Sequence, residues 1–397
     1  MAAAPSNTQQ APAAAGSAGQ PGDQGNQPGP QSVVPFVRGS GKGKYKFFSK
    51  AGLTLTTATQ DLGPIDVKAY DYMRSLLVTV TNTANGGATG TAQADAPFNY
   101  FTNVAVKQPN GQTMYQVSSG LHSALIQKYG YYREYGDPRA DPNFAVNGSA
   151  ATFAFRIPFE LDNRDALGAL PNKDAAAPFT LELTLNTLTN VYGSGQGTSP
   201  TFTVEAWLEA YDQPPTVLNG QGVQTTPPNM NTLQRWTEQN ITMSTGQFDA
   251  RVRKLGNYLR LLIPIMRNSS NARIVTNGWA DPVQIVLDED VKDNIQQADW
   301  TRRIWEHWGY GSIQSGTAAT LGTASIAQVL IDSPLGQDTG VWPIQYFVDG
   351  RDHTENCNWY LPTIESEDYL LRGSWGSAVS KMVMLVCEVL PQGDIFN

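Results

Sequence analysis

Alternating hydrophobic and polar residues predict short β-strands along most of this chain. In residues 179–186 and 201–208 every second position is apolar. A period of two places those apolar side chains on one face, so both segments are predicted to be half-buried strands. Residues 103–117 hold two further apolar runs on either side of Pro109, Asn110 and Gly111, which supply the turn of a predicted β-hairpin.

Two segments carry a helical pattern instead. Residues 118–130 (SSGLHSALIQKYG) begin with a serine cap, place Leu121 and Leu125 one turn apart and close on Gly130. Residues 299–309 (DWTRRIWEHWG) begin with Asp299, place Trp300, Ile304 and Trp308 at helical spacing and close on Gly309. Everything else is predicted to be strand and loop.

The second half of the chain repeats the first at a shift of about 186 residues. DYMRSLLVTVTNTAN aligns with NYLRLLIPIMRNSSN, which places Tyr72 on Tyr258. Further matches keep the same order: LTLTTATQD with ITMSTGQFD, LIQKYGY with IWEHWGY, IPFELDNRD with IQYFVDGRD, and EAWLEAYDQ with MLVCEVLPQ. Spurious alignment of strand-like segments is the alternative, but collinear order favours an internal duplication. A helix, a hairpin and several strands in each copy are the content of a jelly roll.

The predicted fold class is therefore all-β: two tandem eight-stranded jelly rolls with one or two short helices each. Residues 1–45 are predicted to form a disordered, basic N-terminal arm, because the first 32 are mostly small or polar and include no aromatic residue. The first jelly roll is expected over 46–214 and a proline-rich linker over 215–235. The second jelly roll, with a C-terminal tail, is expected over 236–397.

Composition narrows the possible functions. Charged residues make up only 16% of the chain and the net charge is -8, so the folded body is not expected to bind nucleic acid through a general positive field. The two cysteines, Cys357 and Cys387, form no CxxC pair, which argues against zinc and disulfide scaffolds. The N-terminus resembles no signal peptide, so synthesis in a host cytoplasm is expected.

A basic and aromatic segment joins the arm to the body. RGSGKGKYKFFSK contains no acidic residue and includes the candidate contact residues Arg38, Lys42, Lys44, Tyr45, Lys46, Phe47, Phe48 and Lys50. Cations near an anionic bilayer, with aromatic rings at headgroup level, would suit the surface of a membrane. A solvated linker is the alternative.

Three stretches resemble the major coat proteins of tectiviruses and the wider double-jelly-roll virus lineage. They are FNYFTNVAVKQPNGQTMYQVSSGLHSALIQKYG, ADWTRRIWEHWGYG, and FRIPFELDNRDALGALPN followed by FTLELTLN. The resemblance implies a homotrimer whose six barrels form a pseudo-hexamer and tile the shell of a bacteriophage. It also implies an internal membrane around double-stranded DNA, faced by the N-terminal arm, and contacts with neighbouring trimers, penton and minor capsid proteins.

No catalytic, metal or cofactor site is predicted. His122, His307 and His353 show no metal-binding spacing, and the acidic run LDEDVKDN (Asp288, Glu289, Asp290, Asp293) lacks the glycine of a calcium loop. The chain is thus predicted to be a structural protein of the virion and no enzyme. Two alternatives stay open: a secreted two-jelly-roll amidase or carbohydrate-binding protein acting on glycans, and a trimeric virion spike subunit.

Overall fold

The computed structural model describes most of the predicted strands and both predicted helices. It covers residues 36–83, 95–130, 151–161, 166–192, 199–215, 217–218, 221–222, 232–253, 257–274, 280–308, 320–321, 324–325, 340–345, 360–363 and 366–390. His353 and Cys357 lie outside these residues, as does most of the predicted N-terminal arm.

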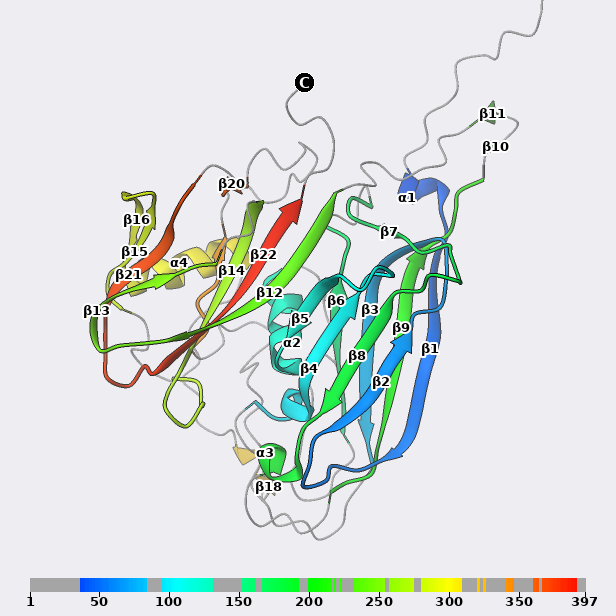
Figure 1. The fold of residues 1–397 in the computed structure, drawn as a ribbon, viewed down its shortest axis with the longest axis horizontal. Coiled ribbons are helices and arrows are strands. Elements are labelled where there is room, and N and C mark those ends of the chain that lie inside the picture. The colour runs from blue at the N-terminus through cyan, green and yellow to red at the C-terminus, as the bar shows by residue number, and fades with distance from the viewer. Residues whose placement is uncertain are drawn as a thin grey trace, which may run out of the picture.

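Two sheets form the first barrel (Figure 1). One has the order β1 (Lys42–Leu53), β9 (Phe202–Tyr211), β3 (Tyr72–Asn82), β6 (Ala151–Pro158), with β7 (Leu170–Pro171) also paired to β3. The other has the order β2 (Gln60–Asp66), β8 (Thr180–Leu185), β4 (Phe101–Lys107), β5 (Thr113–Val117). If β7 is left out, these eight strands can be counted in chain order, so that β8 is the seventh and β9 the eighth. One sheet then has the order 1-8-3-6 and the facing sheet the order 2-7-4-5, which is the strand order of a jelly roll.

The second barrel repeats this arrangement strand by strand. Its first sheet runs β12 (Leu233–Thr242), β22 (Lys381–Leu390), β14 (Tyr258–Arg267), β19 (Ile344–Gln345), with β20 (Leu361–Pro362) also paired to β14. Its second runs β13 (Gly246–Arg251), β21 (Tyr369–Trp375), β15 (Val283–Leu287), β16 (Asp290–Ile295). The predicted fold class of two tandem eight-stranded jelly rolls is confirmed.

The hydrogen-bond register shows that the sequence repeat is also a structural repeat. Tyr72 lies opposite Pro171 in the first barrel, and Tyr258, its counterpart in the alignment, lies opposite Pro362. Ile157 and Ile344 pair with equivalent positions of β3 and β14 in the same way. A slip of one residue would turn every side chain to the other face, so agreement at these positions fixes the equivalence of the barrels.

Both barrels also contain a β-bulge at the same place. The pairing of β3 with β9 shifts between Met73 and Ser75, and that of β14 with β22 shifts between Leu259 and Leu261. The bulged residues are therefore Arg74 and its counterpart Arg260. Bulges at matching positions are retained features of a fold, and these pin the register in each barrel.

The predicted helices are α2 (Gly120–Tyr129) and α4 (Gln297–Trp308). Ser119 caps α2 as expected, because its side chain accepts a hydrogen bond from the Leu121 amide. Three short helices were not predicted: α1 (Phe36–Gly39), η1 (Phe98–Tyr100) and α3 (Leu188–Tyr192). They are too short to show a helical period in sequence. No helix among the described residues is long and apolar enough to span a membrane.

Short two-residue strands complete the described chain. They are β10 (Val217–Leu218) with β11 (Gln221–Gly222), and β17 (Thr320–Leu321) with β18 (Ala324–Ser325). The first pair falls within the predicted proline-rich linker. Neither pair joins the sheets of a barrel.

The neighbouring strands β22 and β14 are buried on both faces of their sheet. Leu262, Met384 and Val386 point into the core of the second barrel, whereas Ile263 and Leu385 belong to a cluster shared with the first barrel. This explains why β14 reads as a continuous apolar run rather than an alternating one, since all its residues are buried. The first barrel thus packs directly against the outside of this sheet.

One parallel bridge joins the barrels through their backbones. Trp236 of β12 lies opposite Tyr115 of β5, so the sheet of the second barrel continues into the second sheet of the first barrel. Both rings are buried, with Trp236 only 1% exposed. In Figure 1 the two barrels accordingly stand side by side, with β12 and β5 between them.

Candidate functional site

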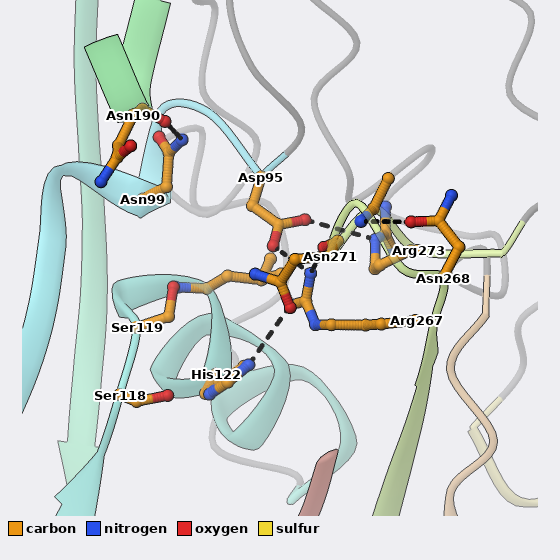
Figure 2. Close-up of polar contacts among 12 residues, drawn as sticks. Asp95, Asn99, Ser118, Ser119, His122, Asn190, Arg267, Asn268, Asn271 and Arg273 are labelled. Atoms are coloured by element: carbon orange, nitrogen blue, oxygen red, sulfur yellow. Dashed lines mark hydrogen bonds and ion pairs between the residues drawn. The ribbon is translucent and has the colours of Figure 1, made fainter. Parts of the chain in front are cut away.

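The most elaborate polar arrangement lies at the junction between the barrels (Figure 2). Asp95, just before η1 in the first barrel, has a carboxylate oxygen 2.6 Å from Nη1 of Arg267, at the end of β14. Arg273 approaches the other oxygen at 3.6 Å. All three residues are buried, so the charges are compensated by one another rather than by water.

His122 extends the same network. Its Nε2 lies 3.4 Å from Nη2 of Arg267, and its Nδ1 lies 2.8 Å from Oε2 of Glu238 on β12. The Ser118 amide and hydroxyl both donate to Glu238, at 2.7 and 2.6 Å. Helix α2 of the first barrel is thereby tied to two strands of the second barrel. His122, which shows no metal-binding spacing in the sequence, is a buried packing residue with polar partners.

The environment of Glu238 strongly favours its charged form. Burial by itself raises the pKa of this carboxyl group, but the attraction of His122 and the hydrogen bonds from His122 and Ser118 outweigh burial and lower the pKa to about 2. Because the pKa in the folded state lies below the ordinary value, the carboxylate stabilises the fold above pH 4.5, and this contribution is lost as the pH falls towards 2.

Replacing Glu238 with glutamine will therefore lower the free energy of unfolding by about 3 kcal/mol near neutral pH. The difference from the unmodified chain should shrink steadily between pH 4.5 and pH 2, which urea unfolding at a series of pH values can measure. Glu182, in a partly exposed pair with Lys107 at 2.7 Å, is the matched control, and Glu182→Gln should change little. A Glu238→Gln difference that is independent of pH would contradict this account.

A polar hollow of about 430 Å³ lies beside the network. Its lining includes Asp95, Asn99, Ser119, His122 and Arg267, which come from both barrels. Among the described residues, no group of three or more histidine, cysteine or acidic side chains could hold a metal ion. These ion pairs join the two barrels, and loss of one partner of a buried pair would leave the other charge uncompensated.

The predicted contact segment is placed mostly in strand β1. Its residues from Lys42 onward pair with β9, so residues 42–45, expected in the disordered arm, belong to the sheet. Lys44 lies 3.6 Å from Glu209, and Lys46 lies 3.1 Å from Glu205. Both ammonium groups also lie within 6 Å of the Trp207 ring, at 5.9 and 5.3 Å. The strand is held by its backbone pairing with β9, and these partly exposed ion pairs add to it.

The aromatic residues of the segment turn the other way. Phe47 and Phe48 pack against the core of the first barrel, and the Tyr45 ring stacks on Tyr70 at 4.0 Å between centroids. Arg38 lies in α1 and is exposed, as is Lys50 towards the far end of β1. The structure thus separates the predicted set: its rings face the protein, and its cations face outward.

The other sequence features have ordinary structural uses. The acidic run forms a tight hairpin turn between β15 and β16, in which Asp288 and Glu289 have positive φ angles of 50° and 75°. Asp288 accepts hydrogen bonds from the amides of Glu367 and Asp368, so its carboxylate has a structural use in this turn. Cys387 is fully buried.

Comparisons with known proteins support the fold. No family model and no curated protein sequence matches this chain. Among solved structures, the major capsid protein P2 of bacteriophage PM2 is 9% identical with a TM-score of 0.51, covering 89% of this chain and 99% of that chain. The STIV major capsid protein is 11% identical with a TM-score of 0.54, covering 88% and 97%. VP54 of PBCV-1 is 9% identical with a TM-score of 0.56, covering 88% and 93%.

This chain is thus a double jelly-roll protein. Its two barrels share the architecture of the major capsid proteins of PM2, STIV and PBCV-1 over nearly their whole length. At such low identity the likeness concerns the fold, and the function is argued separately.

Proposed function

We propose that this chain is the major capsid protein of a membrane-containing icosahedral double-stranded DNA virus, a bacteriophage of tectivirus-like type. The observation that carries the proposal is the repeat of strand order, register and bulge in two barrels, combined with the parallel bridge and buried ion pair that join them. Three chains contribute six similar barrels, and a nearly six-sided trimer can meet several lattice neighbours with one sequence. Neighbouring trimers, penton and minor capsid proteins are its proposed partners in the virion.

Native mass tests this function against its alternatives. A stable species near three times 43.1 kDa supports the coat protein, whereas a monomer at micromolar concentration would favour a glycan-acting amidase or a carbohydrate-binding protein. Copy number in purified particles separates a coat protein, which is abundant, from a trimeric spike. The buried, structural use of the junction residues supports a protein without enzymatic activity.

The arm is proposed to reach the internal membrane at one end of the first barrel. Phe36 packs edge-on against Tyr72 and Tyr211, with centroid distances of 5.3 and 5.7 Å, and so anchors the chain where it enters the sheet. Arg38 and Lys42 are exposed near this anchor. Lys50 lies eight residues further along β1, roughly 26 Å away at the usual strand rise, so one flat surface does not meet all three.

Replacing Arg38 and Lys42 together with glutamine will weaken binding to vesicles containing phosphatidylserine. About 1 kcal/mol for each cation corresponds to about a thirtyfold loss for the pair. Cosedimentation with vesicles measures the effect, and Lys50→Gln, at the other end of the strand, should bind like the unmodified chain. Equal losses in both variants would contradict the proposed orientation while leaving the coat function intact.

A further inference from the structure

Two exposed strand edges lie on opposite sides of the molecule. Strand β1 ends one sheet of the first barrel, and β16 ends one sheet of the second. Within the described part of the chain, no strand pairs with the outer edge of either. Figure 1 shows β1 at the right of the molecule and β16 at the left. Unpaired edges invite pairing with another chain unless they are covered.

The internal repeat relates these edges to the one junction that is already paired. In the first barrel, Ser75 follows the bulge and lies opposite Glu209, which lies opposite Lys44 on its other side. In the second barrel, the equivalent Leu261 lies opposite Cys387, which lies opposite Trp236. Lys44 of β1 is therefore the counterpart of Trp236 of β12.

A second bulge gives the counterpart on the other side. In the first barrel, Val106 of β4 pairs with Tyr115 of β5, and the register shifts directly after this pair. In the second barrel, Ile285 of β15 pairs with Asp293 of β16, and the register shifts directly after that pair. Asp293 of β16 is therefore the counterpart of Tyr115. Trp236 and Tyr115 form the parallel bridge between the barrels, so their counterparts, Lys44 and Asp293, occupy the corresponding positions on the two open edges.

The charges on the two edges are complementary. Lys42, Lys44 and Lys46 alternate along the outer face of β1, with no acid in the strand before Leu53. The edge of β16 carries Asp290 and Asp293 with Lys292 between them, and Asp293 also pairs with Arg303 of α4. The basic β1 edge facing this net acidic strand favours one register, whereas pairing of two β1 edges would oppose like charges.

The burial of the two helices agrees with the equivalence between the paired junction and the two open edges. All residues of α2 are buried, because the second barrel covers that helix. Its counterpart α4 leaves Ala298, Arg302 and Glu306 exposed. The surface that covers α2 is the outside of the sheet β12-β22-β14, whose counterpart is the outside of β1-β9-β3.

We infer that β1 of one copy docks alongside β16 and α4 of a second copy, parallel and with Lys44 opposite Asp293. This inference rests on the proposed trimer and names the surfaces that form it. The contact is head to tail, so each copy offers one surface and receives the other, and such contacts close into a ring. If the rotation between barrels is one sixth of a turn, the ring closes at three copies.

Paired cysteines test the register. Lys44→Cys and Asp293→Cys, combined in one chain and oxidised, should yield covalent trimers on a non-reducing gel. Strands β1 and β16, which hold these positions, lie on opposite sides of one molecule, so the bond forms only between copies (Figure 1). Each single variant is the control for reaction with the native cysteines, and should stay uncrosslinked.

Charge reversal provides an independent measurement. Lys44→Glu should weaken trimer association about tenfold at low salt, and adding Asp293→Lys should restore it. Lys50→Glu, on the same strand but beyond the bulge that follows Lys46, is the matched control and should associate normally. Circular dichroism confirms that each variant is folded.

The outcomes separate this inference from the proposed function. A native trimer that gives neither the covalent trimer nor the rescue by charge reversal overturns the β1–β16 contact and leaves the coat function standing. A native monomer at all concentrations overturns both.

Discussion

Replacement of Arg267 by methionine will lower the free energy of unfolding by about 3 to 5 kcal/mol, because it leaves the Asp95 carboxylate buried without its nearest counter-charge. Arg267 is only 2% exposed, and besides Asp95 its guanidinium donates to the Asn271 carbonyl at 2.8 Å. Chemical unfolding at a fixed protein concentration measures the loss.

The control for Arg267 is an ion pair of the same kind on the surface. Arg251 lies 3.0 Å from Asp368, but its side chain is 69% exposed. Arg251→Met should cost less than about 1 kcal/mol, because water and salt already screen that pair. If the two methionine variants were equally stable, the ion pairs at the junction would have no special role in holding the barrels together.

Replacement of Trp236 by alanine will cost about 3 to 5 kcal/mol, since it opens a cavity at the point where the two sheets join. The indole packs in the cluster shared by both barrels, and its Nε1 donates to Gln234 at 3.3 Å. The separation of unfolding into two transitions, one for each barrel, would show that the junction itself has been loosened.

Trp207 is the matched control for Trp236. It lies on the outer face of β9, half-buried beneath Lys44 and Lys46. Trp207→Ala should affect the fold less, since little cavity forms at a half-buried position. Equal losses for both tryptophans would mean that burial at the junction adds nothing to the stability of the chain.

The sequence predicted strands best where one face of the strand is buried and the other face is exposed to solvent. In β8 the residues alternate between buried and half-buried throughout, which is the pattern that periodicity detects. Strand β14 shows no alternation, and it was found only because the repeat aligned it with β3. Strand β14 is apolar on both faces because it packs against both barrels. A short window of sequence holds no information about that packing.

The junction network could not be predicted, because its members are far apart in sequence. Asp95 and Arg267 are separated by 172 positions, and His122 and Glu238 by 116. One clue was present: Arg260 and Arg267 stand at either end of an otherwise apolar run, and a cation in such a run needs a buried partner. Which acid serves as that partner depends on how the barrels pack.

The segment from Arg38 to Lys50 was correctly identified as unusual, but its conformation was not predicted. Its glycines and lysines suggest a solvated linker, and strand propensity is weak at most of its positions. Glu205 and Glu209 supply the charges that allow the lysines to lie in a sheet. Those glutamates lie far along the chain from the segment, with Glu205 159 positions beyond Lys46, so tertiary context outweighs local preference here.

The bulges at Arg74 and Arg260 bear on ancestry. The two arginines now serve different purposes, Arg74 binding Glu160 within its barrel and Arg260 donating to the Gly130 carbonyl across the junction. A backbone irregularity that outlasts the divergence of its surroundings was already present in the single barrel that was copied. The position of this β-bulge can therefore help to identify related barrels whose sequences are too different to be aligned.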